Sequence, residues 1–266
     1  MKETNNNNKY LVEFNSIEEF YKYIKETPIN NAFSGRELSS ERNGSEFTGT
    51  ESFDEAVSLL KNGDKDIAKK LTQKIKAKSI GIEHAKKAIT TYDVYGYQAS
   101  VPRYLQGVPT NMINKKVVMQ KQKVIVINKD VGYAAMIKKE QIIEESVKAF
   151  EIIKKIEAQG IRAVLNVIWG VSEKGKSIVC KIRVKSANER LNISKMAFIM
   201  CHQSMLRRIL FRFEETYPEF TESFTFGYGY PMKEHNKEFC KNEYFLPALM
   251  GNVNVENVND MNVFKA

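Results

Sequence analysis

The sequence predicts an α/β protein in which helices flank a mixed, mostly parallel sheet. Three neighbouring features predict this class. The run at 123–128 is short and β-branched, as expected of a strand buried on both faces of a sheet. Residues 138–159 place apolar side chains at three- and four-residue spacings, which indicates an amphipathic helix, and a further strand follows from 161. A helix between two strands returns the chain so that the second strand can lie parallel to the first.

The first part of the chain is predicted to be helical. Residues 1–15 open with a polar stretch that includes four consecutive asparagines, so we expect a disordered tail. Capping boxes at Ser16–Glu19 and Ser52–Glu55 predict two short helices, because the serine and glutamate side chains satisfy free backbone N–H groups. The lysine-rich residues 65–90 are predicted to form another helix, with a break near Gly81 as the alternative.

The character of the sequence changes at 92–112. Tyrosines alternate there with glycine and proline, which is typical of an irregular segment packed on another surface. Residues 113–122 are polar and basic and predict a hinge. We therefore expect a helical and irregular region at 16–118 and an α/β domain at 119–266.

The second part of the chain continues the sheet. A tight turn between the runs 161–171 and 177–184 predicts a hairpin, which makes the sheet mixed. A mostly apolar helix is predicted from Ser194 to about Thr216. Further strands are predicted at 224–230 and 244–246.

The composition of the chain indicates which partners and which cellular compartment to expect. The 266 residues carry a formal net charge of +9, which favours anionic partners, with nucleic acid first. A lysine-rich solvated surface explains the same charge without any partner. Three cysteines cannot supply a disulfide framework, and no apolar run is long enough to span a bilayer. We expect a protein of the reducing cytosol with no membrane partner.

The loop after the strand at 123–128 is the first candidate ligand site, because strand ends and helix N-termini meet there in Rossmann-like sheets. In von Willebrand factor A-type domains this loop carries Asp-x-Ser-x-Ser, which binds a divalent cation. The chain resembles a degenerate version, with Asn128, Asp130 and Gly132 at those positions. Asn128 and Asp130 offer oxygen ligands and Gly132 does not. We expect no cofactor; the alternative is Mg²⁺ or Mn²⁺ held by Asn128 and Asp130.

No catalytic residue is assigned from the sequence. Cys201 and His202 are adjacent on a predicted helix and point about 100° apart, so they do not share one zinc ion. Nothing in the sequence orients His235 toward Cys201 as its base. The chain has no glycine-rich phosphate loop after a strand.

Basic and aromatic residues supply the second candidate site. Lysines neutralise phosphates, tyrosines stack on unpaired bases, and arginines bind phosphate or carboxylate through two bonds. Pairing with nearby glutamates and carbonyls is the alternative for the arginines. The candidate nucleic-acid contacts are Lys69, Lys70, Lys74, Lys76, Lys78, Lys86, Lys87, Tyr95, Tyr97, Arg207, Arg208 and Arg212.

Several blocks of the chain resemble an uncharacterised protein family encoded by tailed bacteriophages and prophages. They are Phe47–Thr50 with Ser52–Leu60, Val101–Pro109 with Met112, and His202–Arg208 with Glu214–Thr216. The resemblance covers about residues 47–216. It implies a phage origin and a location in the host cytoplasm, and it implies no activity and no catalytic residues.

Three functions fit these features. We favour a non-catalytic phage accessory protein that binds nucleic acid, or a phage or host protein, through a basic surface. The second is a divalent-metal-dependent phosphoesterase or nuclease acting through Asp130, which requires more carboxylates at that loop. The third is a virion or assembly component. The sequence does not give the oligomeric state.

Overall fold

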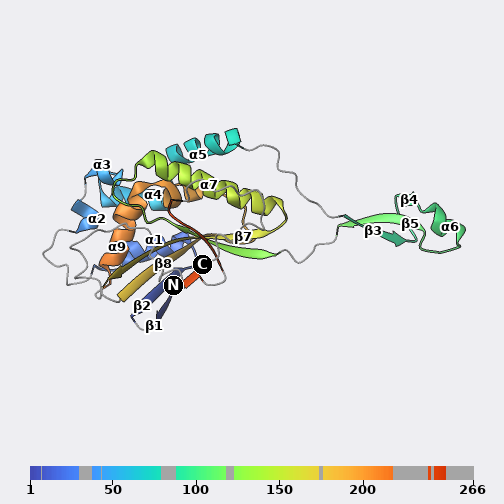
Figure 1. Cartoon of the computed structure of the whole chain (residues 1–266), viewed down its shortest axis with the longest axis horizontal. Helices are drawn as coiled ribbons and strands as arrows, with labels where there is room; N and C mark the ends of the chain where they lie inside the picture. Colours follow the sequence, from blue (N-terminus) through green and yellow to red (C-terminus); the bar gives the residue numbers. More distant parts are fainter. Residues whose placement is uncertain are drawn as a thin grey trace.

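The computed structural model describes residues 1–6, 8–29, 38–42, 44–78, 88–117, 123–173, 176–217, 239–240 and 243–249. Within these residues, the chain forms a large unit of one six-stranded sheet with helices, and a small unit with a three-stranded sheet (Figure 1). The mixed α/β class predicted from the sequence is confirmed.

The large sheet is mixed. Its strands are β1 (Lys2–Asn6), β2 (Lys9–Phe14), β6 (Val124–Asp130), β7 (Arg162–Glu173), β8 (Lys176–Lys185) and β9 (Tyr244–Leu246). They lie in the order β1-β2-β8-β7-β6-β9. The pairs β2–β8, β7–β6 and β6–β9 are parallel, whereas β1–β2 and β7–β8 are antiparallel. The predicted hairpin and the predominance of parallel pairs are both confirmed.

One face of this sheet holds the main core. Leu165, Val167 and Trp169 alternate along β7 and belong to the same buried cluster as the apolar sides of the helices. Ile168 points to the other face, where it packs with Val179, Cys240 and Phe245 in a smaller cluster. The helices of the large unit therefore gather on the face that carries Trp169.

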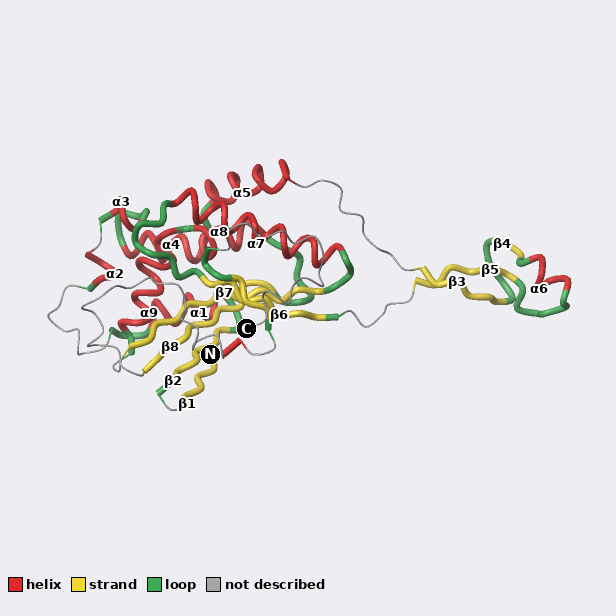
Figure 2. Tube along the Cα trace, viewed as in Figure 1, coloured by secondary structure: helices red, strands yellow, loops and turns green. Residues whose placement is uncertain are grey.

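The helices of the large unit as far as Cys201 are α1 (Ile17–Glu26), α2 (Ser39–Arg42), α3 (Ser45–Thr48), α4 (Phe53–Asn62), α5 (Lys65–Lys78), α7 (Lys139–Ala158) and α8 (Ile193–Cys201). The helices predicted to begin at Ser16 and Ser52 and the one predicted at 138–159 are confirmed as α1, α4 and α7. The helix predicted at 65–90 is wrong at its end, because α5 ends at Lys78 and residues 88–90 belong to a strand. The serine half of both predicted capping boxes is present: the hydroxyl oxygens of Ser16 and Ser52 each accept a bond of 3.1 Å from the backbone N–H three residues later. The Glu19 and Glu55 carboxylates each accept a bond of 2.7 Å from the N–H of the residue before the serine. Helix α7 joins β6 to the parallel strand β7, as expected, and α5 lies over α7 and α8 as an outer layer (Figure 2).

The prediction of one continuous helix at 194–216 is wrong. The backbone of His202 is extended and ends α8, and a π-helix, η2 (Met205–Leu210), leads into α9 (Phe211–Glu215). The His202 ring accepts a bond of 3.0 Å from the Ser204 N–H. This side chain–backbone bond takes an N–H that a continuous helix would use.

Residues 1–15 do not form the predicted disordered tail, because β1 and β2 lie within them. Strand β2 pairs with β8, with Lys9 opposite Ser177 and Phe14 opposite Ile182. Val12 and Phe14 lie on the side of β2 that enters the main core, whereas Leu11 packs against the smaller cluster on the other side.

The small unit replaces the predicted irregular segment and hinge. It contains β3 (Ala88–Asp93), β4 (Gln98–Ala99), α6 (Val101–Leu105) and β5 (Met112–Val117), with β5 between the other two strands. Figure 1 draws it apart from the large unit.

The domain boundaries differ from those expected. Helices α1, α4 and α5 share the core of the large unit with β6 to β8, so 16–118 is not a separate region. The predicted strand at 224–230 lies outside the described residues. None of the helices described is both long enough and apolar enough to cross a membrane.

Candidate functional site

The predicted metal ligands lie at the carboxyl end of β6 and are buried. The amide nitrogen of Asn128 donates to Glu243 Oε2 at 2.7 Å, and its oxygen accepts from Asn166 Nδ2 at 2.9 Å. The Asp130 carboxylate accepts the Gly132 N–H at 2.8 Å, which closes the turn after the strand. Both proposed ligands therefore use their polar atoms to hold the chain itself.

Lys181 supplies a positive charge beside this group. Its Nζ lies 2.8 Å from Glu243 Oε2 and 3.5 Å from Glu13 Oε1. The ammonium thus neutralises the carboxylate that binds Asn128. In the described part of the chain, no group of three or more His, Cys, Asp or Glu side chains is placed to hold a metal ion.

Lys129 has the opposite orientation and is fully buried on the helix side of β6. Its Nζ donates to the carbonyl oxygens of Asp130, Pro247 and Ala248 at 3.0, 2.7 and 3.0 Å. Burial lowers the pKa of this lysine to about 8, although the neighbouring Asp130 opposes the change. Lys129 therefore ties the segment after β9 to the end of β6.

The arginines predicted to contact nucleic acid are buried on η2 and α9. Arg208 is fully buried; its guanidinium donates to the carbonyl oxygens of Ser40, Glu41 and Thr50 and to the Thr50 hydroxyl, at 2.9–3.1 Å. Burial lowers its pKa from the usual range. These bonds fasten residues 40–50 to η2.

The two neighbouring arginines have similar roles. Arg207 stacks on Phe47 with its guanidinium carbon 4.2 Å from the ring centre, and donates to the carbonyl oxygens of Phe47, Ala135 and Ile137. Arg212 stacks on Phe53 and pairs with Glu41 and Glu215. With exposed fractions of 3%, 0% and 8%, Arg207, Arg208 and Arg212 are not presented to a phosphate outside the chain.

His202 lies in a buried polar group with Asp64 and Ser204. Its Nε2 is 3.7 Å from Asp64 Oδ2, and its Nδ1 accepts from the backbone of Ser204. The Ser204 hydroxyl donates to the Thr48 carbonyl at 2.7 Å. The serine hydroxyl is therefore turned away from the imidazole, and the geometry is not that of a nucleophile and its base.

Two of the cysteines are poor nucleophiles. Burial raises the pKa of Cys201 and of Cys240 to about 12, so both thiols are protonated at neutral pH. His235, the base considered for Cys201, lies outside the described residues.

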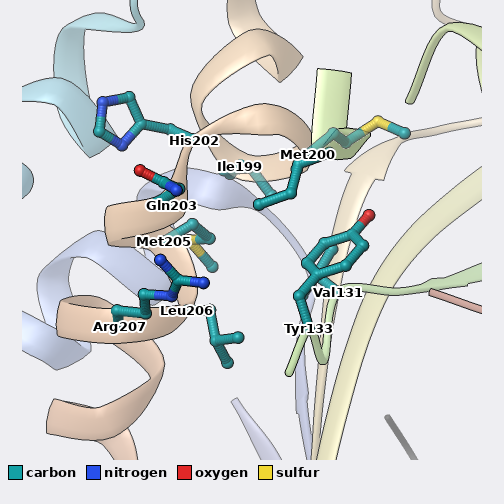
Figure 3. Close-up of a pocket in the computed structure, with 10 residues that line it drawn as sticks. Val131, Tyr133, Ile199, Met200, His202, Gln203, Met205, Leu206 and Arg207 are labelled. Atoms are coloured by element: carbon teal, nitrogen blue, oxygen red, sulfur yellow. The ribbon is translucent and has the colours of Figure 1, made fainter. Parts of the chain in front are cut away.

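A small cavity lies between the loop after β6 and the junction of α8 with η2. Figure 3 shows Val131 and Tyr133 on one side and Met205, Leu206 and Arg207 on the other. Its volume is about 10 Å³, which is room for one water molecule. It is too small for an organic ligand.

Helix α5 carries the lysine part of the predicted surface. Ile67, Leu71 and Ile75 are buried, whereas Lys69 and Lys70 are exposed on the opposite side. Lys74 is also exposed and lies 3.6 Å from Glu144 of α7. The remaining predicted lysines are divided: Lys76 and Lys78 belong to α5, and Lys86 and Lys87 lie outside the described residues.

The small unit carries the tyrosine part. Tyr95 and Tyr97 are 69% and 59% exposed. Four further large apolar side chains of this unit are more than half exposed and were not among the predicted contacts: Val94, Val101, Tyr104 and Leu105. The signal that could have found them is the apolar residues at 101–105 next to the tyrosines, in a stretch with almost no charge.

Comparison with known proteins gives a family. The sequence profile described as a domain of unknown function, DUF7192, matches residues 2–264. The chain belongs to the DUF7192 family. No curated protein and no solved structure matches the chain. The DUF7192 match spans both units.

Proposed function

We propose that this DUF7192 chain is a non-catalytic phage accessory protein that binds nucleic acid through α5 in the host cytoplasm. The observation that supports it is the position of α5. Its apolar side is buried, and Lys65, Lys69, Lys70 and Lys74 are exposed on an outer surface of the large unit. Residues 65–78 contain six lysines and one aspartate, Asp66, which gives a local charge of +5.

This charge suits the phosphate backbone more than any base. Lysine ammonium groups neutralise phosphates as point charges and release bound counterions, so affinity depends on salt and little on sequence. The buried guanidinium groups of Arg207, Arg208 and Arg212 are not part of the proposal, because they hold the chain together.

We also propose a relationship to Rossmann-like and von Willebrand factor A-like domains. If β6, β7, β8 and β9 are counted as strands one to four, their order in the sheet is 3-2-1-4. This is the start of the order found in doubly wound folds, here with the third strand reversed. The bonds of Asn128 and Asp130 favour a loop that has become structural, so we do not extend the proposal to metal-dependent catalysis.

The test is electrophoretic or fluorescence titration of single-stranded and duplex DNA over a range of salt concentrations. Lys69→Gln/Lys70→Gln removes two exposed charges from α5. We expect about tenfold weaker binding at low salt and a salt slope smaller by roughly two, since each lysine lost removes about one phosphate contact.

The matched control is Lys22→Gln/Lys25→Gln on α1, which removes the same charge from exposed lysines of another helix. We expect it to bind like the wild type. Absence of binding by the wild-type protein at low salt, or equal loss in both double variants, would contradict the proposal.

A second candidate function is a virion or assembly component. The exposed apolar side chains of the small unit favour it, because such surfaces mark contacts with other proteins. Mass spectrometry of purified phage particles tests it: the chain is present in particles if it is a virion component.

A further inference from the structure

Among the side chains that the structure describes, the small unit exposes several apolar ones and buries none. Of its residues 90–114, whose side chains the structure describes, not one is buried. Seven of its large apolar side chains are exposed, by 44–77%: Tyr92, Val94, Tyr95, Tyr97, Val101, Tyr104 and Leu105. We refer to residues 92–105 as the tip. A three-stranded sheet of this size gains stability when an apolar face is covered.

The exposed area of the tip matches one side of a protein interface. Four tyrosines and three aliphatic side chains exposed to this degree present on the order of 700 Å². A standard interface buries about 800 Å² on each partner. The tip alone is therefore close to the size that a stable pair of proteins requires.

The chemistry of the tip suits protein better than nucleic acid. Between 93 and 114 the sequence has two charged residues, Asp93 and Arg103, so this stretch is neutral. A phosphate backbone requires positive charge, and aliphatic side chains such as Val101 and Leu105 do not stack on bases. Tyrosine with one arginine and few other charges is the composition of the centre of a protein interface.

The tip is also complementary to itself. In a two-fold symmetric dimer each contact occurs twice. Asp93 of each copy can therefore pair with Arg103 of the other copy, which gives two ion pairs of opposite charge. Arg103 lies within the tip, with its guanidinium carbon 4.3 Å from the centre of the Tyr92 ring. In the described three-stranded sheet, β3 is an outer strand, so a second copy can also pair along it.

We propose that the tip is a self-association surface and that its occupant is the tip of a second copy of this chain. The proposal goes beyond nucleic-acid binding and uses a different part of the molecule from α5.

The first experiment measures the mass of the full chain in solution at micromolar concentrations by sedimentation or light scattering. We expect twice the 30.6 kDa of one chain. Tyr95→Ser/Tyr104→Ser/Leu105→Ser should raise the dissociation constant of the dimer by at least about tenfold, because aromatic anchors dominate such interfaces. The control is Met136→Ser, which removes an 84% exposed side chain from the large unit and should leave the dimer intact.

The second experiment exchanges the charges. Asp93→Arg and Arg103→Asp should each weaken association alone, and an equimolar mixture should restore it, because the mixed pair again places opposite charges together. Circular dichroism identifies a variant that has lost structure.

The following results would overturn the proposal: a monomeric wild type, a triple tip variant that stays dimeric, dissociation caused by Met136→Ser, or folded charge variants that do not associate when mixed. A monomeric wild type whose triple tip variant loses DNA binding would assign the tip to nucleic acid instead.

Discussion

At the scale of single residues, His202 links burial to acid stability. Its side chain is 4% exposed and stacks on Phe198, with ring centres 5.1 Å apart. Burial lowers the pKa of the imidazole from 6.5 to about 4, and Asp64 only partly offsets this effect. Between these two values the unfolded chain binds a proton that the folded chain does not.

We therefore predict that His202 makes the protein less stable in acid. Stability rises with pH wherever the unfolded state holds more protons, so this contribution is complete above pH 6.5 and is lost as the pH falls toward 4. The loss amounts to about 3 kcal/mol. Urea unfolding of the wild type and His202→Gln should give a constant difference at pH 7–8. The free energy of unfolding of the variant should then fall less steeply between pH 6 and 5, by about 1 kcal/mol per pH unit. Parallel pH profiles would contradict this assignment.

The arginines show where sequence reasoning stops at this scale. The charge of Arg208 suggests a surface, yet its partners are backbone carbonyls of residues 40, 41 and 50, far away in sequence. Every residue has a backbone carbonyl, so the amino-acid sequence does not show which carbonyl groups will bind a buried arginine. Lys181 and Glu243 escaped prediction for a related reason, because they are 62 residues apart and meet only when β9 joins β6.

At the scale of elements, the connection between α4 and α5 depends on Gly63. Its backbone φ is +77°, a value that residues with a side chain rarely adopt. A Cβ atom placed there would lie 2.8 Å from the Ser194 carbonyl oxygen at the start of α8. The missing side chain thus allows α4, α5 and α8 to meet. Gly160, at the end of α7, has a similar φ of +79° and open space around it.

We predict that Gly63→Ala destabilises the protein by about 3 kcal/mol or more, because backbone strain adds to a contact with a carbonyl that cannot move aside. Gly160→Ala should cost only about 1–2 kcal/mol, since strain acts there alone. Denaturant unfolding of both variants measures the difference. Equal losses would show that the contact with Ser194 is unimportant.

Local sequence patterns predicted most of the helices and strands. They failed where a strand pairs with another strand that is far away in the sequence. The β7–β8 hairpin and α7 were predicted because alternation, helical spacing and a short turn are all local signals. Strand β2 was missed because its six residues are stabilised by β8, far along the chain. The small unit was missed because its tyrosines, glycines and prolines suggest a loop, although β5 bridges β3 and β4.

At the scale of the whole molecule, the two units differ in the buried side chains that stabilise them. The large unit shares one buried cluster that runs from Val12 to Ala248. The small unit contributes no side chain to it among residues 90–114. Its stability is therefore separate from that of the large unit.

We predict that replacing residues 88–117 with a short Gly/Ser linker leaves the large unit folded, with a thermal midpoint within a few degrees of the wild type. Calorimetry and near-UV circular dichroism, which reports on the buried Trp169, measure this. A large fall in the midpoint would show that the small unit supports the main core.

The parallel pairing of β2 with β8 determines when the sheet can be completed during synthesis. Lys9 leaves the ribosome early, whereas its partner Ser177 is translated 168 residues later. The β6–α7–β7 unit can form within the nascent chain in the meantime, and the β7–β8 hairpin can form as soon as β8 has been translated, because their contacts are closer in sequence. The first strands of the chain are thus among the last to join the sheet, and until then the outer edge of β8 is open to pairing with neighbouring chains.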